Sequence, residues 1–285
     1  MSGASGGMQV CVNGELGPVD ALRVSPLDHG LLVGDGVFET LRVYGGVPFA
    51  WTRHLQRLAR SAAGLGLGIP EVATLQDQAD AVLAANTLTE ARLRITITGG
   101  PAPLGSERAA VAPTVVVAAS ALTPWPPTAD VVTVPWPRNE RGATAGLKTI
   151  SYAENVRALA FAHDRGAGEA IFANTRGDLC EATGSNVFVV RAGAVLTPPE
   201  ASGCLLGVTR ALVLELAAEL GIGAEETDLP IAALADADEA FLSSTTREVQ
   251  AIAHVDGVAL PDAPGLVTAR LAEAFEALVA RDLDP

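Results

Sequence analysis

A proline-rich segment near the middle of the chain, Thr123-Pro124-Trp125-Pro126-Pro127, constrains the fold more than any other feature. Proline lacks a backbone N–H and forces the residue before it into an extended conformation, so this segment cannot lie inside a regular helix or a central strand. Patterns typical of strands and helices alternate on both sides of it. We therefore expect two α/β domains, at residues 1–122 and 128–285, joined by a linker at residues 123–127.

Short apolar or β-branched runs in the first half predict strands. They are Met8–Val12, Ala21–Val24, Val37–Tyr44, Arg92–Thr98 and Thr114–Ala119. Gly45-Gly46 supplies a hairpin turn. Apolar residues at helical spacing from Leu55 to Leu65 predict a helix that ends in a glycine-rich stretch, and a second helix is expected over Glu71–Asn86. The N-terminal domain should therefore be a small sheet with two helices.

The second half shows the same alternation without any internal repeat or low-complexity tract. The predicted strands are Val131–Val134, Ala170–Ala173, Val187–Val190 and Ala240–Ser243. The predicted helices are Tyr152–Arg165, Gly207–Leu220 and Gly265–Arg281.

Composition and charge narrow the classes of partner. The 285 residues are 49% hydrophobic and 18% charged, which is typical of a globular chain. The net charge of −14 would repel nucleic acid and anionic membranes, so we expect neither as a partner. Small molecules and a second copy of the chain are the expected partners.

Three scattered cysteines, Cys11, Cys180 and Cys204, form neither a disulfide framework nor a metal-site spacing. The first seven residues lack the basic and apolar regions of a signal peptide and predict a short flexible tail, and no apolar run approaches the ~20 residues of a membrane span. These features favour a cytoplasmic protein.

Lys148 and Glu181 together suggest cofactor chemistry. A lysine amine forms an imine with an aldehyde, and a carboxylate keeps a pyridine nitrogen protonated, which are the two protein groups that pyridoxal phosphate (PLP) needs to act as an electron sink. Alone, each residue would be a solvated surface charge. The motifs that follow Glu181 change this interpretation: Asn186-Val187-Phe188, Leu196-Thr197 and Leu205-Leu206-Gly207-Val208-Thr209-Arg210.

In this order, the motifs resemble the signature of class IV (fold type IV) PLP-dependent aminotransferases. The resemblance extends from Asp28-His29-Gly30 and the stretch 34–40 to Ser244-Thr245-Thr246-Arg247-Glu248, which is nearly the whole chain. It implies the α/β (α+β) architecture of a fold type IV enzyme, with two α/β domains and the cofactor site at their interface. It also implies PLP as cofactor and a homodimer.

The resemblance assigns roles to individual residues. Lys148 would hold PLP as an imine and move the proton between the substrate Cα and the cofactor. Glu181 would hold the pyridine nitrogen, and Asn186 would orient the site. Arg57, in His54-Leu55-Gln56-Arg57-Leu58, would grip the phosphate, with Arg53 as the fallback. The remaining phosphate contacts would come from Val208 and Thr209 at a helix start and from the hydroxyls of Ser244 and Thr245.

The substrate side is less defined. Where bacillary-type D-amino acid transaminases carry an Arg-x-His carboxylate trap, this chain has Leu104 and Ser106, and Phe38 replaces a tyrosine. A substrate carboxylate still needs a cationic partner. The candidates are Arg108, Arg138 and Arg141. We expect Phe38, Arg108, Arg138 and Thr246 to contact the substrate.

Several activities fit this family. We expect a transaminase that acts on D-amino acids and 2-oxo acids. The alternatives are an aminodeoxychorismate lyase, which forms 4-aminobenzoate and pyruvate, then a branched-chain L-amino acid transaminase, or an inactive PLP-binding protein. The chain has no phosphate-binding P-loop, no dinucleotide-binding glycine motif and no nucleophile elbow, and its four histidines have no metal-ligand spacing. We therefore expect no metal site.

Overall fold

The computed structural model describes residues 7–285, and residues 1–6, where most of the flexible tail is expected, lie outside the described part. The chain forms two compact units. Of the described residues, unit 1 contains residues 7–123 together with Leu147–Ser151 and Leu283–Pro285, and unit 2 contains Pro124–Gly146 and Tyr152–Asp282.

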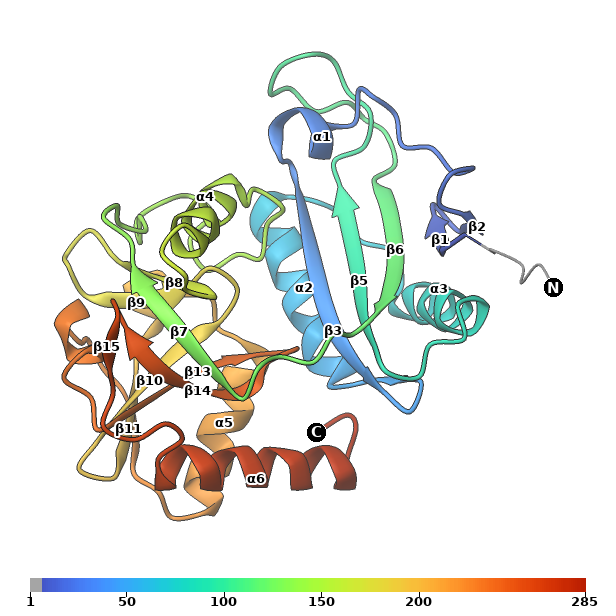
Figure 1. The fold of residues 1–285 in the computed structure, drawn as a ribbon. Coiled ribbons are helices and arrows are strands. Elements are labelled where there is room, and N and C mark those ends of the chain that lie inside the picture. Colours follow the sequence, from blue (N-terminus) through green and yellow to red (C-terminus); the bar gives the residue numbers. More distant parts are fainter. Residues whose placement is uncertain (1–6) are drawn as a thin grey trace. The chain divides into compact units, whose positions relative to one another are not determined.

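Unit 1 is a six-stranded antiparallel sheet, and its two longer helices cover one face (Figure 1). Its elements are β1 (Gln9–Val12), β2 (Glu15–Pro18), α1 (His29–Val33), β3 (Gly36–Tyr44), β4 (Val47–Pro48), α2 (Trp51–Leu65), α3 (Val72–Ala85), β5 (Ala91–Thr98) and β6 (Thr114–Ala121). The strand order is β2-β1-β6-β5-β3-β4. Alternate residues of β3, namely Val37, Leu41 and Val43, pack with Leu58 of α2 and Leu75 of α3 in the core.

Unit 2 is built on a mixed sheet of nine strands in the order β12-β11-β10-β13-β14-β7-β8-β9, with β15 beside β14. Its elements are β7 (Thr128–Thr133), α4 (Ala153–His163), β8 (Glu169–Ala173), β9 (Leu179–Ala182), β10 (Asn186–Arg191), β11 (Ala194–Thr197), η1 (Glu200–Ser202), α5 (Val208–Glu219), β12 (Ala224–Glu226), η2 (Ile231–Leu234), β13 (Glu239–Ser244), β14 (Glu248–Val255), β15 (Val258–Ala259) and α6 (Leu266–Arg281). The central strands β10 and β13 are buried along almost their whole length, as expected for strands covered on both faces.

Two short segments from later in the sequence belong to unit 1, although both lie within residues 128–285, which were predicted to form the second domain. Leu147–Ser151 lies along β3, where Phe38 N donates to Lys148 O at 3.1 Å and Ile150 N donates to Gly36 O at 2.9 Å. At the other end of β3, Asp284 accepts from Thr52 N at 2.8 Å and so caps the start of α2. Segments this short have no periodicity of their own, so only their hydrogen bonds reveal where they pack.

Most expected elements are confirmed with shifted ends, but the predicted strand Ala21–Val24 is wrong. These residues form a turn followed by irregular chain. The proline-rich segment has no regular structure, as expected, and Pro124–Pro127 lies in unit 2, where Pro126 O accepts from Gln250 Nε2 at 2.6 Å.

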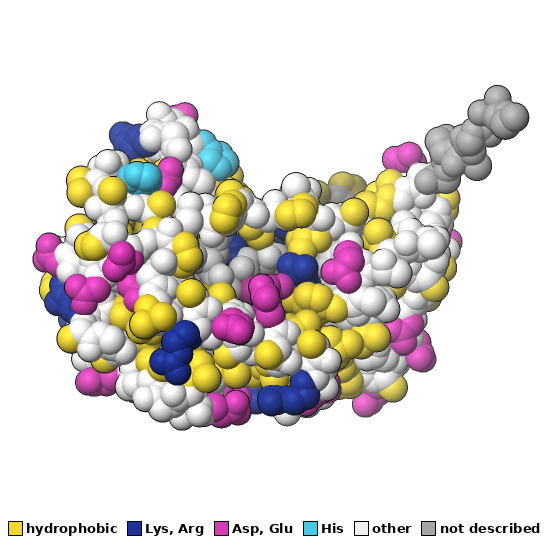
Figure 2. Space-filling model, turned by 60° about the horizontal axis from the view of Figure 1, so that its bottom comes forward, with side chains coloured by type: hydrophobic (Ala, Val, Ile, Leu, Met, Phe, Trp, Pro, Cys, Tyr) yellow, Lys and Arg dark blue, Asp and Glu magenta, His cyan; other side chains and the backbone are white. Residues whose placement is uncertain are grey.

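The surface matches the acidic composition. On the face drawn in Figure 2, acidic side chains are spread among hydrophobic ones, and basic side chains do not gather into one patch. Within residues 7–285, no helix combines the length and the hydropathy that a membrane span requires.

Candidate active site

Lys148 is held on unit 1 by its backbone. Its N–H donates to Ser61 Oγ of α2 at 3.1 Å, and its carbonyl accepts from Phe38 N on β3. Gly36 permits this close pairing, because a Cβ there would lie 2.7 Å from Ile97 O and 2.9 Å from Ile150 Cδ1. The lysine backbone is therefore fixed between a helix and a strand.

The Lys148 amine lies beside an aromatic ring that also carries a guanidinium. Lys148 Nζ is 4.3 Å from the centroid of the buried Phe38 ring, and Arg94 Cζ, from the neighbouring strand β5, is 3.7 Å from the same centroid. The two cationic groups are thus no farther apart than the sum of these distances. Two like charges over one ring favour an anion nearby.

A charged cluster lies behind Phe38, on the helix-covered face of the sheet. Glu39 is fully buried and accepts from Arg57 Nε at 2.8 Å, Arg57 Nη2 at 2.7 Å and His54 Nδ1 at 2.7 Å. Burial alone would raise the Glu39 pKa, but Arg57 and His54 outweigh it and the pKa is lowered. Burial lowers the His54 pKa, although Glu39 opposes this, so the imidazole is neutral near pH 7. Glu39 therefore fixes the orientation of the Arg57 guanidinium.

Arg108 is paired with a carboxylate of its own unit. Its Nε and Nη2 donate to Asp35 Oδ2 and Oδ1 at 2.7 and 2.5 Å, and its Nη1 donates to Gly66 O at 3.2 Å. This bidentate pairing with a carboxylate of the same chain fixes the loop that carries Arg108. This pairing argues against Arg108 as the anchor of a substrate carboxylate.

Glu181 lies on β9 of unit 2 with both carboxylate oxygens engaged. Oε1 is 3.3 Å from Arg138 Nε, and Oε2 accepts from Leu205 N at 2.9 Å. Arg138 also donates to Glu154 Oε2 at 2.7 Å and to Asn155 Oδ1 at 3.1 Å. Arg138 is thus a support for Glu181, which argues against the expected contact of Arg138 with the substrate.

The thiols beside Glu181 are not suited to nucleophilic chemistry. Cys180 and Cys204 are buried, and burial raises the pKa of both, to about 11 for Cys204. Both therefore stay protonated near neutral pH, where only the thiolate would react.

The start of α5 is packed closely against Asn186. Gly207 is the N-cap without any side-chain capping bond, and Val208 and Thr209 of the first turn are buried. A Cβ on Gly207 would lie 2.1 Å from Asn186 Oδ1, so a larger residue would have to displace the Asn186 side chain. Asn186 in turn donates from Nδ2 to Leu205 O at 2.7 Å. The amides of a helix start favour an anion such as phosphate.

Ser244, Thr245 and Thr246 lie where β13 turns into β14, two strands of the same sheet as β10. All three are partly exposed. In unit 1 the predicted residues Lys148, Phe38 and Arg57 come together through β3, and in unit 2 Glu181 meets Arg138, with Asn186 beside the start of α5.

Three features of the site were not predicted from the sequence. Glu39 is a charged residue in the buried row Val37, Leu41 and Val43, and strand alternation alone could have flagged it. Arg94 becomes visible only through the pairing of β5 with β3. Lys148 is also the only lysine in the chain, against eighteen arginines.

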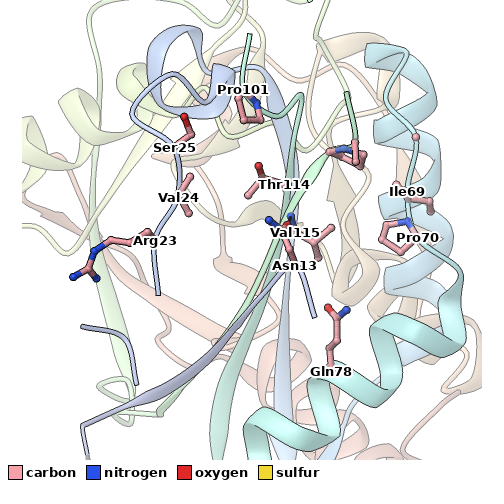
Figure 3. A pocket seen from close by; sticks show the side chains of 13 residues that line it. Asn13, Arg23, Val24, Ser25, Ile69, Pro70, Gln78, Pro101, Thr114 and Val115 are labelled. Carbon is pink, nitrogen blue, oxygen red and sulfur yellow. Dashed lines mark hydrogen bonds between the residues drawn. The ribbon is translucent and has the colours of Figure 1, made fainter. Parts of the chain in front are cut away.

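A separate cavity of about 690 Å3 in unit 1 offers no comparable chemistry (Figure 3). It is lined by Asn13, Arg23, Val24, Ser25, Gly68, Ile69, Pro70, Gln78, Pro101, Ala112, Pro113, Thr114 and Val115. Two of its polar side chains have structural roles, since Asn13 Oδ1 accepts from Val115 N and Thr114 Oγ1 donates to Asp28 Oδ2. Among residues 7–285, no group of His, Cys, Asp and Glu side chains is arranged to hold a metal ion.

Comparisons with known proteins agree with this geometry. The model of the family described as amino-transferase class IV matches residues 36–255. A Methanocaldococcus jannaschii protein provisionally named a branched-chain-amino-acid aminotransferase is 34% identical, over 94% of this chain and 96% of its own length. The D-alanine aminotransferase of Listeria monocytogenes is 32% identical, over 94% and 95%. The solved structure of the Escherichia coli branched-chain amino acid aminotransferase is 30% identical, covers 95% and 94%, and superposes with a TM-score of 0.89.

Proposed function

The chain belongs to the class IV aminotransferase family, and on that premise we propose that it moves amino groups between D-amino acids and 2-oxo acids. The observation that carries this proposal is the placement of the only lysine, fixed by its backbone with its amine over Phe38 and near the Arg94 guanidinium. The similarity to D-alanine aminotransferases over nearly the full length supports the D-amino acid side of the proposal.

Class IV aminotransferases depend on PLP, which supplies an electron sink for the substrate Cα. The described residues fit this cofactor, because the start of α5, whose N-cap Gly207 has no side-chain capping bond, suits a phosphate, and Glu181, which is held by Arg138 and Leu205 N, suits a pyridinium. Lys148 would form the covalent link and move the proton at the substrate Cα. Val208, Thr209, Ser244 and Thr245 would hold the phosphate, and Asn186 would position Gly207. Arg57, which was expected to grip the phosphate, donates to Glu39 in the same forked way as Arg108 does to Asp35, so we do not assign it a phosphate contact.

We assign the substrate carboxylate to Arg94, since Arg108 and Arg138 each grip carboxylates of this chain. In an α-amino acid the nitrogen and the carboxylate are bonded to the same carbon. If the substrate nitrogen lies at Lys148, its carboxylate would therefore lie between Lys148 and Arg94, which both lie over the Phe38 ring. Phe38 and Thr246 would complete the substrate contacts. An arginine suits this role because its planar fork binds a carboxylate with two hydrogen bonds.

Replacing Arg94 by Met should raise the KM for both amino acid and 2-oxo acid by about tenfold to a hundredfold, the range for one lost charge-assisted hydrogen bond. PLP binding should be unchanged. The matched control is Arg92→Met, another exposed arginine of β5, whose KM should equal that of the wild type. An Arg94→Met enzyme with wild-type KM would remove Arg94 from the substrate site.

The visible spectrum of the PLP-loaded enzyme tests the proposed activity directly. D-alanine or D-glutamate should bleach the visible absorption band of the imine between Lys148 and PLP, and the L-enantiomers should leave this band unchanged. Bleaching by L-amino acids would instead indicate the branched-chain activity named for the relatives above. A band that neither enantiomer changes would favour the lyase, which release of 4-aminobenzoate and pyruvate from aminodeoxychorismate would then demonstrate.

A homodimer working in the cytoplasm is part of the proposal. Large apolar side chains are exposed in α1 and on the loop after β5, with Leu31 71% and Leu104 79% exposed, and exposed apolar surface favours a protein partner where it is contiguous. Sedimentation equilibrium should give the mass of two chains, and a monomer would contradict the dimer.

A further inference from the structure

Besides the buried ion pair of Glu39 and Arg57 in unit 1, unit 2 contains a buried ion pair that has no role in the function proposed above. Arg247, directly after Thr246, is 9% exposed, and Glu169 at the start of β8 is 2% exposed. Arg247 Nη2 lies 3.3 Å from Glu169 Oε2, and Arg247 Nη1 donates to Gln250 Oε1. The guanidinium also stacks on Trp125, with Cζ 3.7 Å from the ring centroid. Arg247 thus points into the unit and is occupied by protein groups.

Hydrogen bonds link Arg247 and its stacking partner Trp125 to the β13–β14 turn. Arg247 N donates to Ser244 Oγ at 3.3 Å, and Trp125 Nε1 donates to Thr246 Oγ1 at 3.4 Å. The next residue, Glu248, has a φ of 59°, a left-handed conformation that a non-glycine residue adopts at a cost. The surrounding contacts must therefore hold the turn in this shape.

The other end of the pair reaches the turn that follows Glu181. Glu169 Oε1 accepts from Ala170 N at 3.0 Å, from Thr183 N at 3.2 Å and from the Thr183 hydroxyl. A buried carboxylate is tolerated when it has this many donors and a cationic partner. Glu169 is therefore a rigid anchor point against which Arg247 can fix the turn.

We propose that Glu169 and Arg247 are positioning residues that, with Trp125, hold the Ser244–Thr246 turn in the shape that binds the phosphate of PLP. The inference rests on the phosphate role proposed above for Ser244 and Thr245. Neither charged group touches the phosphate. Their contribution is to order the turn in advance, so that binding does not have to pay the entropy of ordering it.

Titrations of the apoenzyme with PLP and with pyridoxal, which lacks the phosphate, separate this role from general stability. Glu169→Gln keeps the shape of the side chain but removes its charge, and it should weaken PLP binding by about tenfold to a hundredfold while pyridoxal binding changes by less than about twofold. Arg247→Lys should act in the same direction, because lysine lacks the flat fork that stacks on Trp125.

The matched control is Glu239→Gln. Glu239 is a buried carboxylate at the opposite end of β13 that accepts from Val267 N at 3.0 Å and Thr268 N at 2.8 Å at the start of α6. This variant should lower the Tm without changing the ratio of PLP to pyridoxal affinity. An unchanged ratio in both Glu169→Gln and Arg247→Lys, whether or not binding weakens, would overturn the proposal.

A variant of the turn itself, Ser244→Ala with Thr245→Val, tests the premise separately. If this double variant lowers the ratio of PLP to pyridoxal affinity and neither Glu169→Gln nor Arg247→Lys does, only the positioning role is wrong. If the double variant also leaves the ratio unchanged, the phosphate placement is wrong and the positioning role is rejected with it. No amino acid is present in these titrations, so their outcome is independent of the proposed D-amino acid specificity.

Discussion

Lys148→Ala should lower transaminase turnover by about four orders of magnitude. Proton transfer by a positioned base alone contributes up to ~10⁴-fold, and the substitution also removes the amine that would form the covalent link. The measurement is steady-state turnover of D-alanine with a 2-oxo acid. Lys148→Arg is the matched control, since it keeps a cation near Phe38 but cannot form an imine, and it should be as inactive as Lys148→Ala.

Because Lys148 is the only lysine, a chemical trap gives an independent result. Borohydride reduction of the PLP-loaded wild type should add one pyridoxyl group, located on Lys148 by peptide mass spectrometry. In Lys148→Ala that modification should disappear, leaving at most the α-amino group as a target. Turnover of Lys148→Ala within about tenfold of the wild type, or a wild-type enzyme that traps no pyridoxyl group on Lys148, would refute the assigned role.

The predictable part of the fold consists of elements whose own sequence pattern determines them. The amphipathic spacing of Leu55, Leu58 and Ala62 defines α2, and the apolar runs of β10 and β13 define central strands. Helices and strands that depend on contacts with distant residues were not predicted from the sequence. The single turn α1 exists because Asp28 Oδ1 accepts from Gly30 N, and β14 mixes polar and apolar residues without a clear alternation.

The candidate site divides in the same way. Motif resemblance pointed to Lys148, Glu181 and the start of α5, because spacing along the chain carries that information. The partners of the arginines could not be predicted, since they come from segments distant in sequence. Arg108 pairs with Asp35, and Arg138 pairs with Glu181. Because of these pairings, we propose Arg94 instead of Arg108 or Arg138 as the residue that binds the substrate carboxylate.

Glu39→Gln should lower the free energy of unfolding by about 3 kcal/mol, because removing one partner of a buried ion pair leaves the other without compensation. Glu39 is fully buried and accepts three hydrogen bonds from Arg57 and His54. Urea denaturation near pH 7 measures the change. The matched control is Glu90→Gln, which breaks a looser ion pair of 3.7 Å between Arg42 and a Glu90 side chain that is 57% exposed, and it should cost less than about 1 kcal/mol.

The same cluster predicts how stability depends on pH. The Glu39 pKa is lower in the folded chain than in the unfolded chain, so the unfolded state binds more protons below the ordinary Glu pKa of about 4.3, and this stabilisation is lost as the pH falls. The lowered His54 pKa acts in the same direction below about pH 6.5. The free energy of unfolding of the wild type should therefore decrease from pH 7 toward pH 3, and the part of the decrease that falls below about pH 4.3 should be smaller for Glu39→Gln. Parallel curves for the two proteins, or a Glu39→Gln variant as stable as Glu90→Gln, would show that Glu39 does not hold Arg57 and His54 as an ionised carboxylate.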